Sequence, residues 1–205
     1  YLDDYAFLLD ALLESMQAAY RPQDMAWARE LAEALLIHFE DAEHGGFYFT
    51  SHDHEQLIQR PKPAHDGALP SGNGVAAVNL HRLGLLLAEP RYLSAAERCL
   101  RAFYPAIMAY PSAYPGLLAL LDETLNPPRV IVVRGPDHAV TDWAVALTPQ
   151  LRNADILLRL PNGLSLPDAL AKPETPSGTA WICVGSNCFP PVTRIEHFAE
   201  MASRH

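Results

Sequence analysis

The sequence has few cysteines, few basic residues and no long hydrophobic run, and each shortage excludes a class of protein. Its 205 residues include three cysteines, too few and odd in number for a disulfide scaffold, which favours a reducing compartment. Lys and Arg number 15 against 24 Asp and Glu, and the net charge of −9 disfavours nucleic acid and anionic membranes as partners. No apolar run approaches the ~18 residues that cross a bilayer. We expect a cytoplasmic protein that binds neither nucleic acid nor membrane.

The N-terminus also lacks two features, an initiating Met and the basic region of a signal peptide. We interpret the missing Met as a sign that the chain is a piece of a longer protein. Apolar residues make up 49% of the chain and charged residues 19%, which is typical of a globular chain with a real core.

Apolar residues recur with the 3.6-residue period of a helix throughout the first half of the chain. The stripe that begins at Tyr5 and the stripe that begins at Tyr92 follow the same spacing, and the segment from Trp27 corresponds to the segment from Tyr92. The pattern predicts helical hairpins that repeat and then stack or close into a ring. The first expected helix runs from a cap at Asp3 or Asp4 to near Arg21-Pro22, and the others are residues 24–39, 75–87, 92–103 and 114–125.

After residue 126 the sequence pattern changes to short β-branched runs separated by turn residues. These runs predict strands at 129–134, 155–160 and 180–184, with a helix at 139–151 and another at 193–202. We therefore predict a mainly α fold in two parts, helical-hairpin repeats over 1–125 and a small α/β lobe over 126–205.

The densest group of polar and turn residues lies at 60–74, just before a helix that is apolar on nearly every side. Ser71 or Asn73 can cap that helix, and Asp66 is a candidate general acid or base. The alternative is that Gly, Pro, Ser and Asn form a tight capping turn here. Because so long an irregular loop is unusual in a helical array, the functional role stands beside the capping turn as an equal alternative.

Asp3 and Asp4 occupy the equivalent place one repeat earlier. If the helices converge, Asp4 and Asp66 face one cavity, and paired carboxylates are what glycosyl chemistry requires. Ordinary N-capping is the alternative for both residues. Arg60, Lys62, Ser71 and Asn73 would then position a ligand, and Tyr48 would stack on it. Tyr48 and its neighbours Phe47 and Phe49 fit a core role as well.

The histidines and cysteines give weaker patterns. His52 and His54 have the spacing of a metal-binding pair but no further ligand, which favours a solvated loop, and we predict no metal and no cofactor. Cys183 and Cys188 leave open a disulfide or half of a zinc site, although two ordinary thiols fit a reducing compartment best. Cys99 lies on a helix stripe and is expected to be buried.

Several stretches together resemble one family. They are Tyr1–Ala6, Gly45–Thr50, the segment from Arg60 to Asn73, and Cys183 with Cys188–Thr193. In this order they are similar to the C-terminal part of the thioredoxin-domain-containing proteins related to spermatogenesis-associated protein 20. The resemblance implies an N-terminal thioredoxin-like domain outside this chain, the last hairpins of an (α/α)6 toroid like those of N-acylglucosamine 2-epimerases and six-hairpin glycosidases, and a small C-terminal lobe.

Two functional hypotheses follow, and the sequence leaves open whether the chain is an enzyme. The first is a carbohydrate-binding or carbohydrate-modifying cavity that uses Asp66 and Asp4. The second is a non-catalytic scaffold or partner-binding toroid that supports the thioredoxin-like domain. Because the repeat count is incomplete, self-association through exposed hairpin faces is also expected. A redox role for the cysteine pair is a third, weaker idea.

Overall fold

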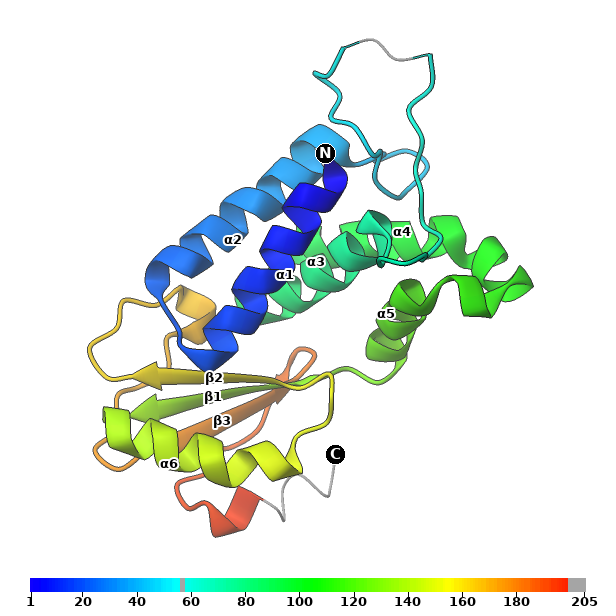
Figure 1. The fold of residues 1–205 in the computed structure, drawn as a ribbon. Coiled ribbons are helices and arrows are strands. Elements are labelled where there is room, and N and C mark those ends of the chain that lie inside the picture. The colour runs from blue at the N-terminus through cyan, green and yellow to red at the C-terminus, as the bar shows by residue number, and fades with distance from the viewer. Residues whose placement is uncertain (56–57, 199–205) are drawn as a thin grey trace. The chain divides into compact units, whose positions relative to one another are not determined.

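The computed structural model describes residues 1–55 and 58–198, and the chain forms two compact units. Residues 1–14 and 23–126 make up unit 1, and residues 15–22 with those from 127 onward make up unit 2. The chain is mainly helical with one small sheet, which confirms the predicted mainly α class (Figure 1). The toroid stays a prediction.

Unit 1 is built from the predicted helices. They are α1 (Leu2–Ala18, its last residues in unit 2), α2 (Pro22–Ala34), α3 (Gly72–Leu87), α4 (Pro90–Ala109) and α5 (Pro115–Leu125). The predicted stripes form the core, with Leu9, Leu80 and Cys99 each fully buried. α4 continues through Pro105 because its apolar face still packs at Ile107, which is 1% exposed. Long amphipathic helices therefore account for this unit.

A π-helical turn, η1 (Leu35–Phe39), ends the segment predicted as one regular helix over 24–39. The chain then crosses to α3 through a loop held by backbone hydrogen bonds. The N–H of Tyr48 donates to the carbonyl of Phe39 at 2.8 Å, and the N–H of Phe49 donates to Pro61 at 2.8 Å. An isolated antiparallel bridge joins Glu40 and Phe47 in this loop.

Unit 2 contains a four-stranded sheet in the order β2-β1-β3-β4. Its elements are β1 (Arg129–Gly135), α6 (Asp137–Leu147), β2 (Ile156–Pro161), β3 (Thr179–Val184) and β4 (Asn187–Cys188). β1 and β2 are parallel and connected through α6, whereas β3 is antiparallel to β1. α6 buries Val140, Trp143 and Leu147 in one cluster with the sheet. The helix predicted for 193–202 falls partly outside the described residues.

The cysteine pair corrects one expectation. Cys183 and Cys188 lie directly opposite each other on β3 and β4, with their Cα atoms 4.0 Å apart, and they form a disulfide. The interpretation as two free thiols is therefore wrong for this structure, because the tight β3–β4 hairpin brings the two side chains together. Cys99 is buried and free, as predicted.

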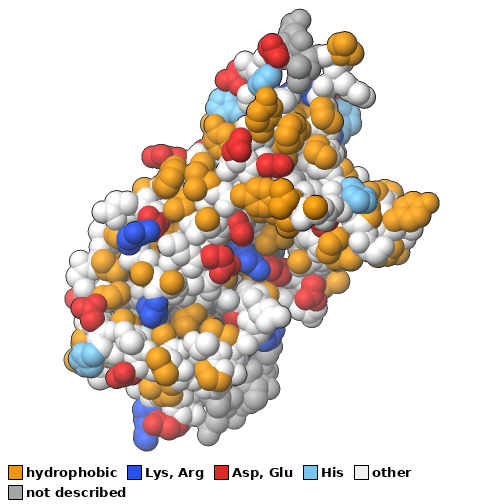
Figure 2. Space-filling model, viewed as in Figure 1, with side chains coloured by type: hydrophobic (Ala, Val, Ile, Leu, Met, Phe, Trp, Pro, Cys, Tyr) orange, Lys and Arg blue, Asp and Glu red, His pale blue; other side chains and the backbone are white. Residues whose placement is uncertain are grey.

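The described surface matches the charge pattern of the sequence. On the face drawn in Figure 2, the Lys and Arg side chains are few and lie dispersed among Asp and Glu. Among the described residues, no helix combines the length and the apolar character that crossing a membrane requires.

Candidate functional site

The start of α3 is the point where the segment 60–74 meets two other helices of unit 1. Ser71, one of the two caps that the sequence allowed, is the N-cap, and its hydroxyl accepts a hydrogen bond from the N–H of Gly74 at 3.2 Å. One carboxylate oxygen of Asp66 accepts a hydrogen bond from the N–H of Ser71 at 2.6 Å. The other accepts a hydrogen bond from the N–H of Gly116, in the first turn of α5, at 2.7 Å. Asp66 thus ties the starts of α3 and α5 together.

The first turn of α1 reaches this point through Asp3. A Cβ on Gly72 would collide with Oδ1 of Asp3, so the glycine lets the carboxylate approach the α3 backbone. Oδ1 of Asp3 is buried and lacks a hydrogen-bond partner among the described residues. Burial, helped by the charge of Asp4, raises the pKa of Asp3.

Asp4 lies apart from this contact. Its side chain is 75% exposed, and Oδ2 accepts a hydrogen bond from the amino group of Tyr1 at 3.0 Å. Successive residues of an α-helix point about 100° apart, so only one of two adjacent aspartates can face a given neighbour. The structure brings Asp3 and Asp66, rather than Asp4 and Asp66, to the start of α3.

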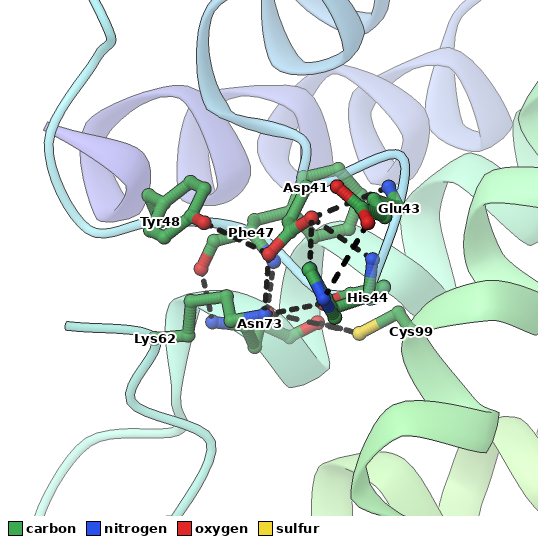
Figure 3. A network of polar contacts seen from close by, with 9 residues as sticks. Asp41, Glu43, His44, Phe47, Tyr48, Lys62, Asn73 and Cys99 are labelled. Carbon is green, nitrogen blue, oxygen red and sulfur yellow. Dashed lines mark hydrogen bonds and ion pairs between the residues drawn. The ribbon is translucent and has the colours of Figure 1, made fainter. Parts of the chain in front are cut away.

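Asn73 is fully buried and clamps two separate pieces of the loop (Figure 3). Its side-chain oxygen accepts from the N–H of Phe47 at 2.7 Å, and its NH₂ group donates to the carbonyls of Phe47 and Pro63, each at 2.8 Å. Asn73 therefore satisfies both backbone groups of Phe47, a residue that is itself fully buried.

A second buried polar centre lies beside this clamp and was missed by the sequence analysis (Figure 3). Asp41 accepts hydrogen bonds from Nζ of Lys62 at 2.8 Å, from the hydroxyl of Tyr48 at 2.8 Å and from the N–H of His44 at 2.9 Å. The bond from Lys62 contributes most to holding the pKa of Asp41 far below its ordinary value, against the effect of burial. The Asp41–Gly45 turn is the signal that could have found it.

The remaining candidate ligand residues also bind the chain itself. The guanidinium of Arg60 lies over the ring of Tyr48, 4.1 Å from its centroid, and donates to the carbonyl of Thr50 at 2.7 Å. Lys62 donates a further bond to the carbonyl of Gly45 at 2.9 Å. Arg60, Lys62, Tyr48, Ser71 and Asn73 are therefore all engaged in holding the segment 41–74 in place.

Three histidines of this region, His38, His52 and His54, pack against other rings. The rings of His38 and His52 lie 5.2 Å apart and nearly parallel, and His54 lies against Tyr1. No group of three or more His, Cys, Asp or Glu in the described part of the chain is arranged to hold a metal ion. Burial raises the pKa of the Cys99 thiol, which keeps it protonated and unreactive.

Comparison with known proteins gives relatives that are much longer than this chain. No family model matches the sequence. The chain is 33% identical over 141 residues to spermatogenesis-associated protein 20 of Rattus norvegicus, covering 68% of this chain and 18% of that protein. It is 26% identical over 204 residues to the Homo sapiens protein of the same name, covering 94% of this chain and 26% of that protein.

An uncharacterized protein of Caenorhabditis elegans is 25% identical over 208 residues, which cover 98% of this chain and 28% of that protein. The chain thus spans no more than 28% of the length of these curated relatives. The matches support the spermatogenesis-associated protein 20 family, and the thioredoxin-like domain stays a prediction.

Proposed function

Taking kinship with the spermatogenesis-associated protein 20 proteins as the premise, we propose that this chain is a non-catalytic helical-hairpin scaffold within a longer protein of that family. In that protein it corresponds to the C-terminal part, with the last hairpins of an (α/α)6 toroid and a small α/β lobe, and it supports the thioredoxin-like domain that the family resemblance implies. Binding of a partner through exposed hairpin faces belongs to the same proposal.

One observation carries the proposal: within the segment 60–74, the side chains of Lys62, Asp66, Ser71 and Asn73 bind the chain's own backbone and side chains. A ligand site needs donors and acceptors that ligand binding completes. Here both carboxylate oxygens of Asp66 accept hydrogen bonds from backbone N–H groups. The side-chain oxygen of Asn73 accepts a hydrogen bond from the chain, and its NH₂ group donates to the chain. Such a loop behaves as a structural clasp between helices.

The exposed end of α4 offers a surface for the partner that a scaffold requires. Tyr104, Met108 and Tyr110 are 47%, 62% and 72% exposed, and they follow one another within two helical turns. Aromatic and methionine side chains are enriched in the cores of protein interfaces. Substitution of these three residues by Ser in the longer protein therefore tests whether this surface binds the partner.

A pair of matched variants tests the structural role of Asp66. We expect Asp66→Ala to lower the free energy of unfolding by about 3 kcal/mol, because it leaves two helix-terminal N–H groups without their carboxylate acceptor. Asp4→Ala removes a side chain that is 75% exposed and should change stability by less than about 0.5 kcal/mol. Urea denaturation followed by circular dichroism measures the free energy of unfolding of both variants. Equal losses would contradict the role of Asp66 in joining the starts of α3 and α5.

A second candidate function, glycosyl chemistry with paired carboxylates, is favoured by Asp3. Its buried Oδ1 lacks a hydrogen-bond partner within residues 1–55 and 58–198, and its pKa is raised, as a general acid requires. Asp66 meets the same helix start. In this proposal Arg60, Lys62, Ser71, Asn73 and Tyr48 would have to exchange contacts within the chain for contacts to the sugar.

A thermal-shift screen with a sugar library separates the two proposals, since a ligand that binds the native state raises its melting temperature. The scaffold predicts no shift with any sugar. A saturable shift that disappears in Asp3→Asn and persists in Asp4→Asn would overturn the scaffold and support the carbohydrate cavity.

A further inference from the structure

Unit 2 contains a hollow of about 200 Å³ at the carboxyl ends of its two parallel strands. Residues of the α1–α2 connection, of the first turns of α6 and of β2 line it, among them Tyr20, Asp137 and Arg159. In Figure 1 the arrowheads of β1 and β2 point to the end of the sheet where α6 begins. Open α/β sheets bind their ligands at this end of the strands, where helix N-termini also gather.

The first turn of α6 presents backbone donors to this hollow. The N-cap is Pro136, which makes no side-chain capping bond, and the first backbone bond of the helix is donated by Val140 to Pro136. The N–H groups of residues 137–139 precede that bond and lack a helical acceptor. Free N–H groups at the positive end of a helix dipole favour an anion.

Two side chains add hydrogen-bond donors that have no acceptor among the residues the structure describes. Arg159, on the edge strand β2, is half-buried, and its guanidinium has no hydrogen-bond or ion-pair partner in the described part of the chain. Tyr20 is 7% exposed, and its hydroxyl is buried without a partner among the described residues. Burial raises the pKa of Tyr20, so the hydroxyl remains a donor. An unsatisfied buried hydroxyl is costly unless something else binds it.

We propose that this hollow binds the phosphate group of a small phosphorylated molecule, with Arg159, the hydroxyl of Tyr20 and the α6 N-terminus as its donors. The planar guanidinium takes two phosphate oxygens side by side, and the helix N–H groups take a third. Asp137 also lines the hollow and is exposed, and its negative charge weakens the binding of an anion. This site lies in unit 2, and it does not rest on the contacts of the segment 60–74 that support the proposed scaffold.

Titration of the 205-residue chain with inorganic phosphate and with glycerol 3-phosphate, at constant ionic strength, tests the proposal by calorimetry. We expect saturable binding, and a preference for one of the two probes shows whether free phosphate or an ester is the better ligand. Arg159→Gln should weaken binding about tenfold or more, because it removes a charged bidentate donor. Asp137→Asn should tighten binding several-fold.

Tyr20→Phe distinguishes ligand binding from folding. Because the hydroxyl has no hydrogen-bond partner in the described part of the chain, its removal should leave the melting temperature unchanged or slightly higher while it weakens phosphate binding several-fold. Arg101→Gln, an exposed change on α4 in unit 1, is the matched control and should bind as the parent does. Absence of saturable binding, or equal binding by Arg159→Gln, Tyr20→Phe and the control, would overturn the proposal.

Discussion

Asn73→Ala should lower the free energy of unfolding by about 4 kcal/mol. The amide of Asn73 is fully buried and is the partner of the N–H of Phe47 and of the carbonyls of Phe47 and Pro63. Alanine leaves these groups buried without partners, and each such group costs about 1–3 kcal/mol. The loss also leaves a small cavity beside Cys99.

Urea denaturation of Asn73→Ala and of Asn153→Ala gives the comparison. Asn153 is exposed, and its substitution should change stability by less than about 0.5 kcal/mol. A loss below about 1 kcal/mol for Asn73→Ala would mean that the loop does not depend on this clamp. Asn73→Asp should be as harmful as Asn73→Ala, because it points a carboxylate at two carbonyl oxygens.

The helices were predictable because their information is local. The stripes that include Leu9 and Leu80 repeat every three or four residues, and burial of one face is enough to fix such helices. Ser71 was predictable as a cap for the same reason, since its partner Gly74 is three residues away. The strand at 129–134 was recognisable from its β-branched run between turn residues.

The roles of the polar residues were not predictable, because their partners are distant in the sequence. Asn73 was one of two candidate caps, yet it binds Phe47, which lies 26 residues earlier. Lys62 was a candidate ligand residue, yet it binds Asp41, which lies 21 residues earlier. A polar residue in a glycine-rich loop has the same local pattern in both roles, and only the folded chain brings the partner within 3 Å.

Asp3 and Asp66 show the same limit at the candidate site. The sequence places two adjacent aspartates at the start of a helix, and nothing local selects the one that faces α3. Asp3 faces α3 in the folded chain, because the missing side chain of Gly72 makes room for its carboxylate. A glycine at the first residue of a helix was the available signal, and its meaning required the neighbouring helix.

A second large loss in the free energy of unfolding is expected in unit 2, for Asp155→Ala. The carboxylate of Asp155 is fully buried and accepts hydrogen bonds from the backbone N–H and the guanidinium of Arg129 and from Arg152. Arg129 is itself 4% exposed and lies at the start of β1. Removal of one partner of a buried ion pair leaves an uncompensated charge and costs about 3–5 kcal/mol. Asp142→Ala, an exposed change on α6, should cost less than about 0.5 kcal/mol.

The difference in unfolding free energy between the parent and Asp155→Ala should depend on pH, and this dependence identifies the charge of the Asp155 carboxylate as its cause. Burial raises the pKa of Asp155, but the bonds from Arg129 and Arg152 together outweigh it and lower the pKa below its ordinary value of 3.8. A carboxyl group with a lowered pKa stabilises the folded state above pH 3.8, and this stabilisation is lost as the pH falls through the folded-state pKa. The gap in unfolding free energy between the parent and Asp155→Ala should therefore be constant near pH 7 and narrow below pH 3.8. Urea denaturation across that range measures it, and a gap that persists unchanged into acid would assign the loss to packing instead of charge.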